Sequence, residues 1–274
     1  MRPPLDTTAG SASLPRPCRP CSPLPLHLTT ETPGRDPYRG RSSQGGPLAK
    51  LTWHGHATCS LETDDGTHLV IDPFFDENPA CDVAVADVEA DFILISHGHK
   101  DHIGDAIPLA ERTGATIIAT FEVATYMETQ GMTVSAHHIG GGVHYPFGYV
   151  KLTPALHGGI IELPGGERYT SLPAGFLINL KSGQRFHHAG DTGLISHMEL
   201  LKGRVDVAML PIGDRYTMGP EDAVRAVEMI EPEVVIPMHY NTWPPIAQDP
   251  EAFKKAVGKR AEVVILAPGG TYDF

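Results

Sequence analysis

The sequence predicts an α/β protein in which two sheets pack face to face with helices on the outside. Short β-type runs broken by turn residues begin at Leu48, and strand and helix patterns then alternate. The same alternation of strand and helix patterns recurs in the second half of the chain, and two halves of this kind favour two packed sheets with outer helices. A hydrophobic content of 41% and a charged content of 20% are ordinary for a globular protein.

The first half begins with runs typical of an antiparallel meander, including a turn at Asp64-Asp65-Gly66. An apolar strand at 92–95 then precedes a histidine-rich segment. The predicted strands of this half are 48–53, 57–62, 68–71, 92–95 and 116–119, and the predicted helices are 103–112 and 122–130, the second ending at Gly131.

The second half alternates strands and helices in the same way. Pro220 suits the first turn of a helix, where its missing N–H leaves no hydrogen bond unmade. The predicted strands are 149–154, 175–180, 185–189, 205–210, 234–237 and 263–266, and the predicted helices are 194–201, 220–230 and 250–257.

Residues 1–47 are predicted to be a disordered tail, because they are rich in Pro, Arg, Ser, Thr and Gly and lack a periodic apolar pattern. The tail has six arginines and three acids, a net charge of +3, so the whole-chain charge of −12 leaves about −15 on the remainder. Residues 48–274 are predicted to form one domain.

Charge and cysteine usage restrict the partners and the compartment. A net charge of −12 disfavours nucleic acid, which calls for a basic face, but it is compatible with a small substrate. Cysteines at 18, 21, 59 and 81 form no disulfide-dense pattern, which favours a cytoplasmic location. No apolar stretch approaches the roughly 20 residues that cross a bilayer. The sequence is compatible with a homo-oligomer.

The segment Ser96-His-Gly-His-Lys-Asp-His102 directly follows the apolar strand at 92–95. In extended chain, residues two apart project to the same side, so His97 and His99 can reach one ion. Asp101 and His102 then face a neighbouring position. Imidazole nitrogens and carboxylate oxygens are ligands of Zn²⁺, and Mn²⁺ or Fe²⁺ also accept them. The segment predicts a metal site that draws further ligands from other strand ends.

Three other predicted strands end in ligand-type residues. His157 follows the strand at 149–154, Asp191 lies in a Gly-flanked turn after 185–189, and His239 follows 234–237. Loops after neighbouring strands converge on one edge of a sheet. Together with the first segment they supply seven ligands, enough for two metal ions.

These ordered motifs resemble those of the metallo-β-lactamase superfamily. A further set of short motifs resembles those of an uncharacterised metal-dependent hydrolase branch close to the ascorbate-phosphate lactonase-like proteins. These motifs are Gly55-His-Ala-Thr58, Ile71-Asp-Pro-Phe74, Thr153-Pro-Ala-Leu-His157, His188-Ala-Gly-Asp-Thr-Gly193, Leu210-Pro-Ile-Gly213, Tyr216-Thr-Met-Gly-Pro220 and Met238-His-Tyr-Asn-Thr242. The resemblance covers residues 48–274 and implies a four-layer αββα sandwich with the site at a sheet edge.

The resemblance also implies the ligand sets. His97, His99 and His157 would hold the first metal, Asp101, His102 and His239 the second, and Asp191 would bridge them. Two divalent ions, with Zn²⁺ expected and Mn²⁺ or Fe²⁺ as alternatives, would share a hydroxide that attacks an ester-like bond, a lactone or a phosphodiester. Asp101 would also orient that hydroxide as the catalytic carboxylate.

Three further residues are candidates for contact with the ligands or the substrate. His56, in the Gly55-His56 turn, could line the pocket, and a purely structural turn histidine is the alternative. Asp72 could accept a hydrogen bond from a ligand imidazole, or only form a turn. His188 lies beside the Asp191 turn.

Two other functions compete with ester hydrolysis of a small substrate. An RNA-processing nuclease of the same superfamily would need a basic face, which the acidic body lacks. A non-catalytic metal-binding protein would be expected to have lost some ligands, whereas all seven are present.

Overall fold

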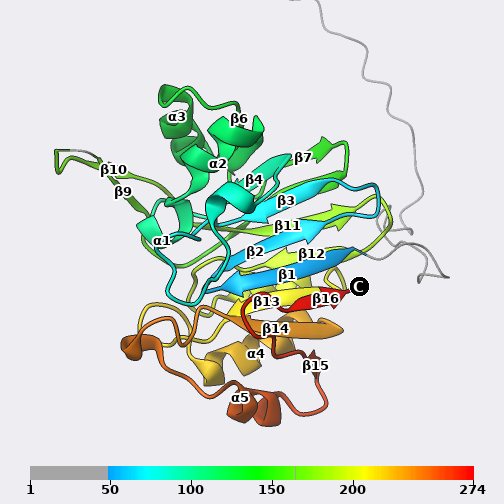
Figure 1. The fold of residues 1–274 in the computed structure, drawn as a ribbon. Helices are drawn as coiled ribbons and strands as arrows, with labels where there is room; N and C mark the ends of the chain where they lie inside the picture. The colour runs from blue at the N-terminus through cyan, green and yellow to red at the C-terminus, as the bar shows by residue number, and fades with distance from the viewer. Residues whose placement is uncertain (1–48, 164) are drawn as a thin grey trace, which may run out of the picture. The chain divides into compact units, whose positions relative to one another are not determined.

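In the computed structural model, which describes residues 49–163 and 165–274, the strands form two seven-stranded mixed sheets and a separate hairpin (Figure 1). Sheet A consists, in spatial order, of β16 (Thr271–Asp273), β1 (Lys50–Gly55), β2 (Thr58–Glu62), β3 (His68–Ile71), β4 (Phe92–Ile95), β5 (Thr116–Thr120) and β6 (Val134–His137). Sheet B consists of β15 (Glu262–Val263), β14 (Val234–Met238), β13 (Val207–Pro211), β12 (Arg185–His188), β11 (Ala174–Leu180), β8 (Gly148–Pro154) and β7 (Gly142–Tyr145). The hairpin pairs β9 (Ile160–Glu162) with β10 (Arg168–Thr170). The predicted tail, residues 1–47, lies outside the described residues and stays a prediction.

The helices begin and end at ordinary signals. Asp249 caps α5 by accepting from the backbone N–H of Glu251 and Ala252, and α2 ends at Gly114 in a left-handed conformation. No helix of the described residues is long and apolar enough to cross a membrane. The α-helices are α1 (Lys100–Ile103), α2 (Ala106–Thr113), α3 (Phe121–Thr129), α4 (Pro220–Ile230) and α5 (Pro250–Val257), and the 3₁₀ turns are η1 (Val85–Asp87), η2 (Ser196–Leu201) and η3 (Pro244–Ile246).

Alternation along the central strands gives sheet A two apolar faces. On β4, Ile93 and Ile95 pack with Leu109 of α2 and Met127 of α3, whereas Leu94 joins the core between the sheets. The period of two that separates these faces is the geometry of an extended strand. A strand buried on both faces reads as a continuous apolar run, as 92–95 does.

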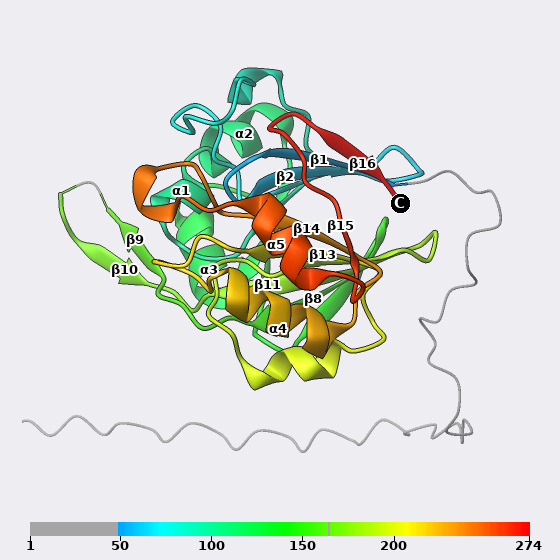
Figure 2. The ribbon, with the colours of Figure 1, turned by 90° about the horizontal axis from the view of Figure 1, so that it is seen from below.

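The core between the two sheets contains side chains from the inner face of sheet A, from sheet B and from the helices on the far side of sheet B. Phe176 of β11 belongs to it, as do Val227 of α4 and Phe253 of α5. Figure 2 shows α2, sheet A, sheet B and α4 following one another from top to bottom. The predicted four-layer αββα sandwich is confirmed.

Strand direction places the carboxyl ends of several strands at one edge of each sheet. β3, β4, β5 and β6 are parallel neighbours, and β1 shares their direction because it is antiparallel to β2, which is antiparallel to β3. In sheet B, β12, β13 and β14 are parallel, and β8 shares their direction through β11. The loops after β1, β3, β4, β8, β12 and β14 therefore share an edge.

Some local predictions were wrong. The helix expected at 103–112 begins later, as α2 at Ala106, and the separate short helix α1 precedes it. Asp105, between the two, accepts hydrogen bonds from the backbone N–H of Phe75 and Asp76. The helix expected at 194–201 is the 3₁₀ segment η2. β6, β7, β9, β10 and β16 were not predicted.

The last residues of the chain pair with the first described strand. Ala49 and Phe274 exchange two backbone hydrogen bonds of 3.0 Å, and β16 continues the pairing along β1. Trp53, near the end of β1, adds a bond from its N–H to Gly270 O and accepts one from Gly269 N. The edge of sheet A is thereby closed by the C-terminal segment.

Candidate metal centre

The seven predicted ligands all follow strands that end at the shared edge. His97 and His99 come after β4, and α1 then carries Asp101 and His102. His157 follows β8, Asp191 follows β12 and His239 follows β14. The structure brings their ligand atoms together in three groups, the third of which contains Asp191 and shares one histidine with each of the other two. The seven residues span about 140 positions of sequence.

Three histidines form the first group. His97 Nε2 lies 2.9 Å from His99 Nδ1, which lies 3.3 Å from His157 Nε2. Four ligands at the usual Zn–N distance of about 2.0–2.1 Å would have their donor atoms about 3.4 Å apart, so the spacing suits one ion. Gly98 is required between the two histidines, because a Cβ there would collide with Ile161 of β9.

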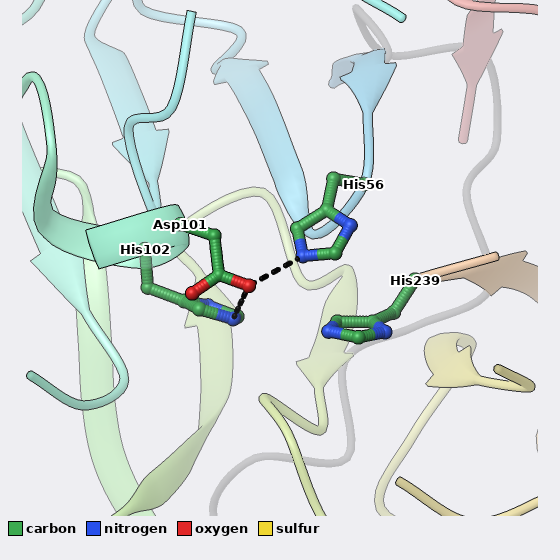
Figure 3. A group of neighbouring side chains, drawn as sticks. All are labelled: His56, Asp101, His102 and His239. Atoms are coloured by element: carbon green, nitrogen blue, oxygen red, sulfur yellow. Dashed lines mark hydrogen bonds and ion pairs between the residues drawn. The ribbon is translucent and has the colours of Figure 1, made fainter. Parts of the chain in front are cut away.

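Asp101, His102 and His239 form the second group, and His56 joins them (Figure 3). Asp101 Oδ2 lies 3.0 Å from His56 Nε2 and 4.0 Å from His102 Nε2. The ligand atoms of these four residues all lie within 4.8 Å of one another. The sequence therefore predicted three members of the second group, but it predicted His56 only as a residue that could line the pocket.

Asp191 touches both groups through one oxygen. Its Oδ2 lies 2.9 Å from His239 Nε2, 3.4 Å from His102 Nε2 and 3.5 Å from His157 Nε2. Its other oxygen, Oδ1, is buried and accepts no hydrogen bond from the described residues. A buried carboxylate oxygen left without a donor is costly unless a cation faces it. The donor set of imidazoles and carboxylates fits divalent metal ions.

The charges of the centre hold Asp191 and His97 in forms that suit a cation, whereas they favour a proton on His102. Burial would raise the pKa of Asp191, but His239 and His102 outweigh it and hold that pKa well below its usual value. Burial lowers the pKa of His97 well below the ordinary value, so its imidazole is neutral. Burial also opposes charge on His102, yet Asp191 and Asp72 raise its pKa well above the usual value. A proton and a metal ion compete for such a nitrogen.

Asp72 lies behind the ligands, in the turn after β3. Its Oδ2 is 2.8 Å from His102 Nδ1 and accepts a hydrogen bond from Ser96 Oγ at 2.7 Å. Ser96 Oγ is 2.9 Å from His97 Nδ1, so one carboxylate is connected to a histidine of each group. Asp72 adopts a left-handed φ of 49°, which Asp tolerates better than most residues.

The hydrogen bonds of the His188 ring go to backbone groups and not to a ligand side chain. Its Nε2 lies 2.9 Å from the carbonyl oxygen of Ala57, and its Nδ1 accepts from the N–H of Gly190 at 3.2 Å. It therefore connects the turn after β1 to the turn that carries Asp191.

Sequence comparison identifies the family of this constellation. A beta-lactamase superfamily domain matches residues 67–240. A UPF0173 metal-dependent hydrolase of Heliobacterium modesticaldum is 50% identical over 236 residues, which covers 82% of this chain and 97% of the relative. A protein of the same description from Enterococcus faecalis is 45% identical over 225 residues, covering 81% and 98%. The chain belongs to the UPF0173 metal-dependent hydrolases of the beta-lactamase superfamily.

Solved structures agree with that assignment. Igni18, described as a novel metallo hydrolase from the archaeon Ignicoccus hospitalis, is 36% identical to this UPF0173 hydrolase, with a TM-score of 0.73 and coverage of 83% of this chain and 98% of that one. An isothiocyanate hydrolase from Delia radicum gut bacteria has a TM-score of 0.65 at 20% identity, which shows a shared fold. The predicted superfamily and the predicted class, a metal-dependent hydrolase, are confirmed. The expected closeness to the lactonase-like proteins stays a prediction.

Proposed function

We propose that this UPF0173 hydrolase cleaves an ester-like bond, in a lactone or a phosphodiester, of a small substrate with two divalent cations, Zn²⁺ being the expected metal. The observation that carries the proposal is the position of Asp191 Oδ2, within 3.5 Å of His157 in the first group and of His102 and His239 in the second. Two cations bound on either side of it would activate a shared water as hydroxide and hold the oxygens of the reacting ester.

The residues divide between holding the cations and handling the water. His97, His99 and His157 would hold one ion, and Asp101, His102 and His239 the other. Among the carboxylates, Asp101 is the accessible one, with 28% of its side chain exposed against 3% for Asp191. This exposure supports the proposal that Asp101 would accept a hydrogen bond from the attacking water and orient it, in addition to holding a cation.

One exposed apolar side chain beside the loops of two candidate ligands supports a substrate that carries an apolar part. Leu156, directly before His157, is 63% exposed. Its N–H donates to Thr192 Oγ1 at 2.9 Å and its carbonyl oxygen accepts from Gly193 N at 3.0 Å, so it lies between the loops of two ligands. An exposed leucine held in that position offers a surface for an apolar part of the substrate.

The experiment that tests the proposal combines elemental analysis with a substrate screen. The purified protein should contain close to two metal ions per chain and should hydrolyse members of a panel of lactones and phosphodiesters. Chelation should abolish turnover and added Zn²⁺ or Mn²⁺ should restore it. Two bound metals without turnover on either panel would overturn the proposal, and turnover confined to precursor RNA would favour the nuclease alternative.

A further inference from the structure

His56 is held in a strained turn at the end of β1. Its φ is 54°, in the left-handed region that costs a residue with a Cβ energy and that recurs at functional sites. Two donors fix its carbonyl oxygen, Trp53 Nε1 at 3.0 Å and the backbone N–H of His239 at 2.9 Å. His239 has the same φ of 54°. The two histidines are therefore held together from opposite sheets.

The ring of His56 is enclosed by groups of the second metal position. Its centroid lies 3.9 Å from that of His239 and 4.8 Å from the ring of Trp243. His56 Nε2 lies 3.0 Å from Asp101 Oδ2, close to the separation of two ligands of one ion. The side chain is completely buried, so Nε2 has no solvent to face.

The other nitrogen of His56 faces a side-chain oxygen, as in two of the five ligand histidines. Nδ1 lies 2.8 Å from Thr242 Oγ1, as His97 Nδ1 faces Ser96 Oγ and His102 Nδ1 faces Asp72 Oδ2. A side-chain oxygen that accepts a hydrogen bond from Nδ1–H leaves the lone pair on Nε2, the usual arrangement for a metal-bound imidazole.

Buried histidines away from the centre are bonded differently. His187 Nδ1 and His188 Nε2 each face a backbone carbonyl oxygen, of Phe176 and Ala57. His54, two residues before His56, directs Nε2 to Ser60 Oγ. His56 therefore shares a side-chain oxygen on Nδ1 with His97 and His102, whereas His187 has a backbone carbonyl oxygen there and His54 and His188 direct Nε2 to an oxygen.

We propose that His56 is a further protein ligand of the second metal position, with Asp101, His102 and His239, and that Thr242 orients its imidazole. The inference rests on the proposed two-metal function and deepens it. It gives the second position four residues of its own against three for the first, with Asp191 shared. Thr242 and His239 follow the same strand, β14, so one loop supplies both a ligand and the group that orients another.

Metal titration of His56→Ala tests the inference, with His54→Gln as the matched control from the same strand. In a chelator competition, the wild type and His54→Gln should bind two Zn²⁺ per chain. His56→Ala should keep one ion and bind the other at least tenfold more weakly, and Thr242→Val should weaken that same ion by a smaller factor. Two ions bound to His56→Ala with unchanged affinity would overturn the inference.

Imidazole ¹⁵N NMR of the wild type keeps the test independent of how well the variants fold. On loading with two equivalents of Zn²⁺, the His56 Nε2 resonance, assigned by its absence in His56→Gln, should move to the metal-bound range while Nδ1 keeps its proton. A proton retained on Nε2 with both ions bound would overturn the inference. A wild type that binds fewer than two ions would instead count against the proposed function.

Discussion

The Asp72 carboxylate and the His102 imidazole meet at 2.8 Å, and both side chains are wholly buried. Because Ser96 Oγ connects the same carboxylate to His97, one carboxylate orients histidines of both ligand groups. Partners of this kind raise the basicity of a ligand imidazole and fix its direction.

Replacing Asp72 by Asn should weaken the binding of both ions by about tenfold to a hundredfold, because the charge behind His102 is lost while the left-handed turn is retained by Asn. Ser96→Ala should weaken mainly the ion held by His97. The measurement is a competition titration against a chelator, with Asp64→Asn in the exposed turn after β2 as the control. Equal affinity in Asp72→Asn and the wild type would contradict this role.

Asp191→Asn should lower the metal content from about two ions per chain to less than one, since a single carboxylate oxygen faces histidines of both groups. Hydrolysis should fall with the metal. Elemental analysis of the dialysed variant is the measurement, and the circular dichroism spectrum of the same sample controls for folding. A variant that kept both ions and the full rate would show that Asp191 is not shared between them.

Leu156→Ser should raise KM about threefold to tenfold, with a smaller effect on kcat, if the side chain contacts an apolar part of the substrate. Loss of one apolar contact is worth roughly 1 kcal/mol, and about 1.4 kcal/mol corresponds to a tenfold change in affinity. Leu200→Ser is a matched control, because Leu200 is 61% exposed and lies in η2, which packs against α4. An equal change of KM in the two variants would show that Leu156 does not contact the substrate.

The buried His187 should make folding stability depend on pH. Burial lowers the pKa of His187 from about 6.5 to about 4, so the unfolded chain takes up this proton first as the pH falls. The stability contributed by its neutral form is complete above pH 6.5 and is lost as the pH falls toward 4, by about 3 kcal/mol between pH 7 and pH 4.

His187→Gln removes the titrating group and keeps a donor for the carbonyl oxygen of Phe176. Urea unfolding at several pH values should therefore show a shallower loss of stability for the variant between pH 7 and pH 4. Identical slopes for the two proteins would mean that His187 does not titrate on unfolding.

The central strands could be predicted from the sequence because apolar runs such as 92–95 are buried on both faces. The edge strands could not. β7 has exposed residues at three of its four positions, and β16 is a three-residue strand of partly exposed side chains. Their pairing depends on partners far along the chain, and no apolar pattern marks it.

The convergence of the seven candidate ligands could be predicted because each is a polar residue that follows a strand pattern. His56 could not be assigned a partner in the same way. It contacts Asp101, 45 positions later, and Thr242, 186 positions later, and only the assembled sheets bring the three together. The Gly55-His56 dipeptide at a strand end was the one signal available.

The pairing of β16 with β1 connects the C-terminal residues to the metal centre. β1 leads directly into His56, and its last residues are held by the backbone of Gly269 and Gly270. A purification tag or a truncation at the C-terminus would therefore disturb a strand that positions a histidine more than 200 residues earlier in the sequence. Variants intended for metal or kinetic measurements are best left unchanged at residues 269–274.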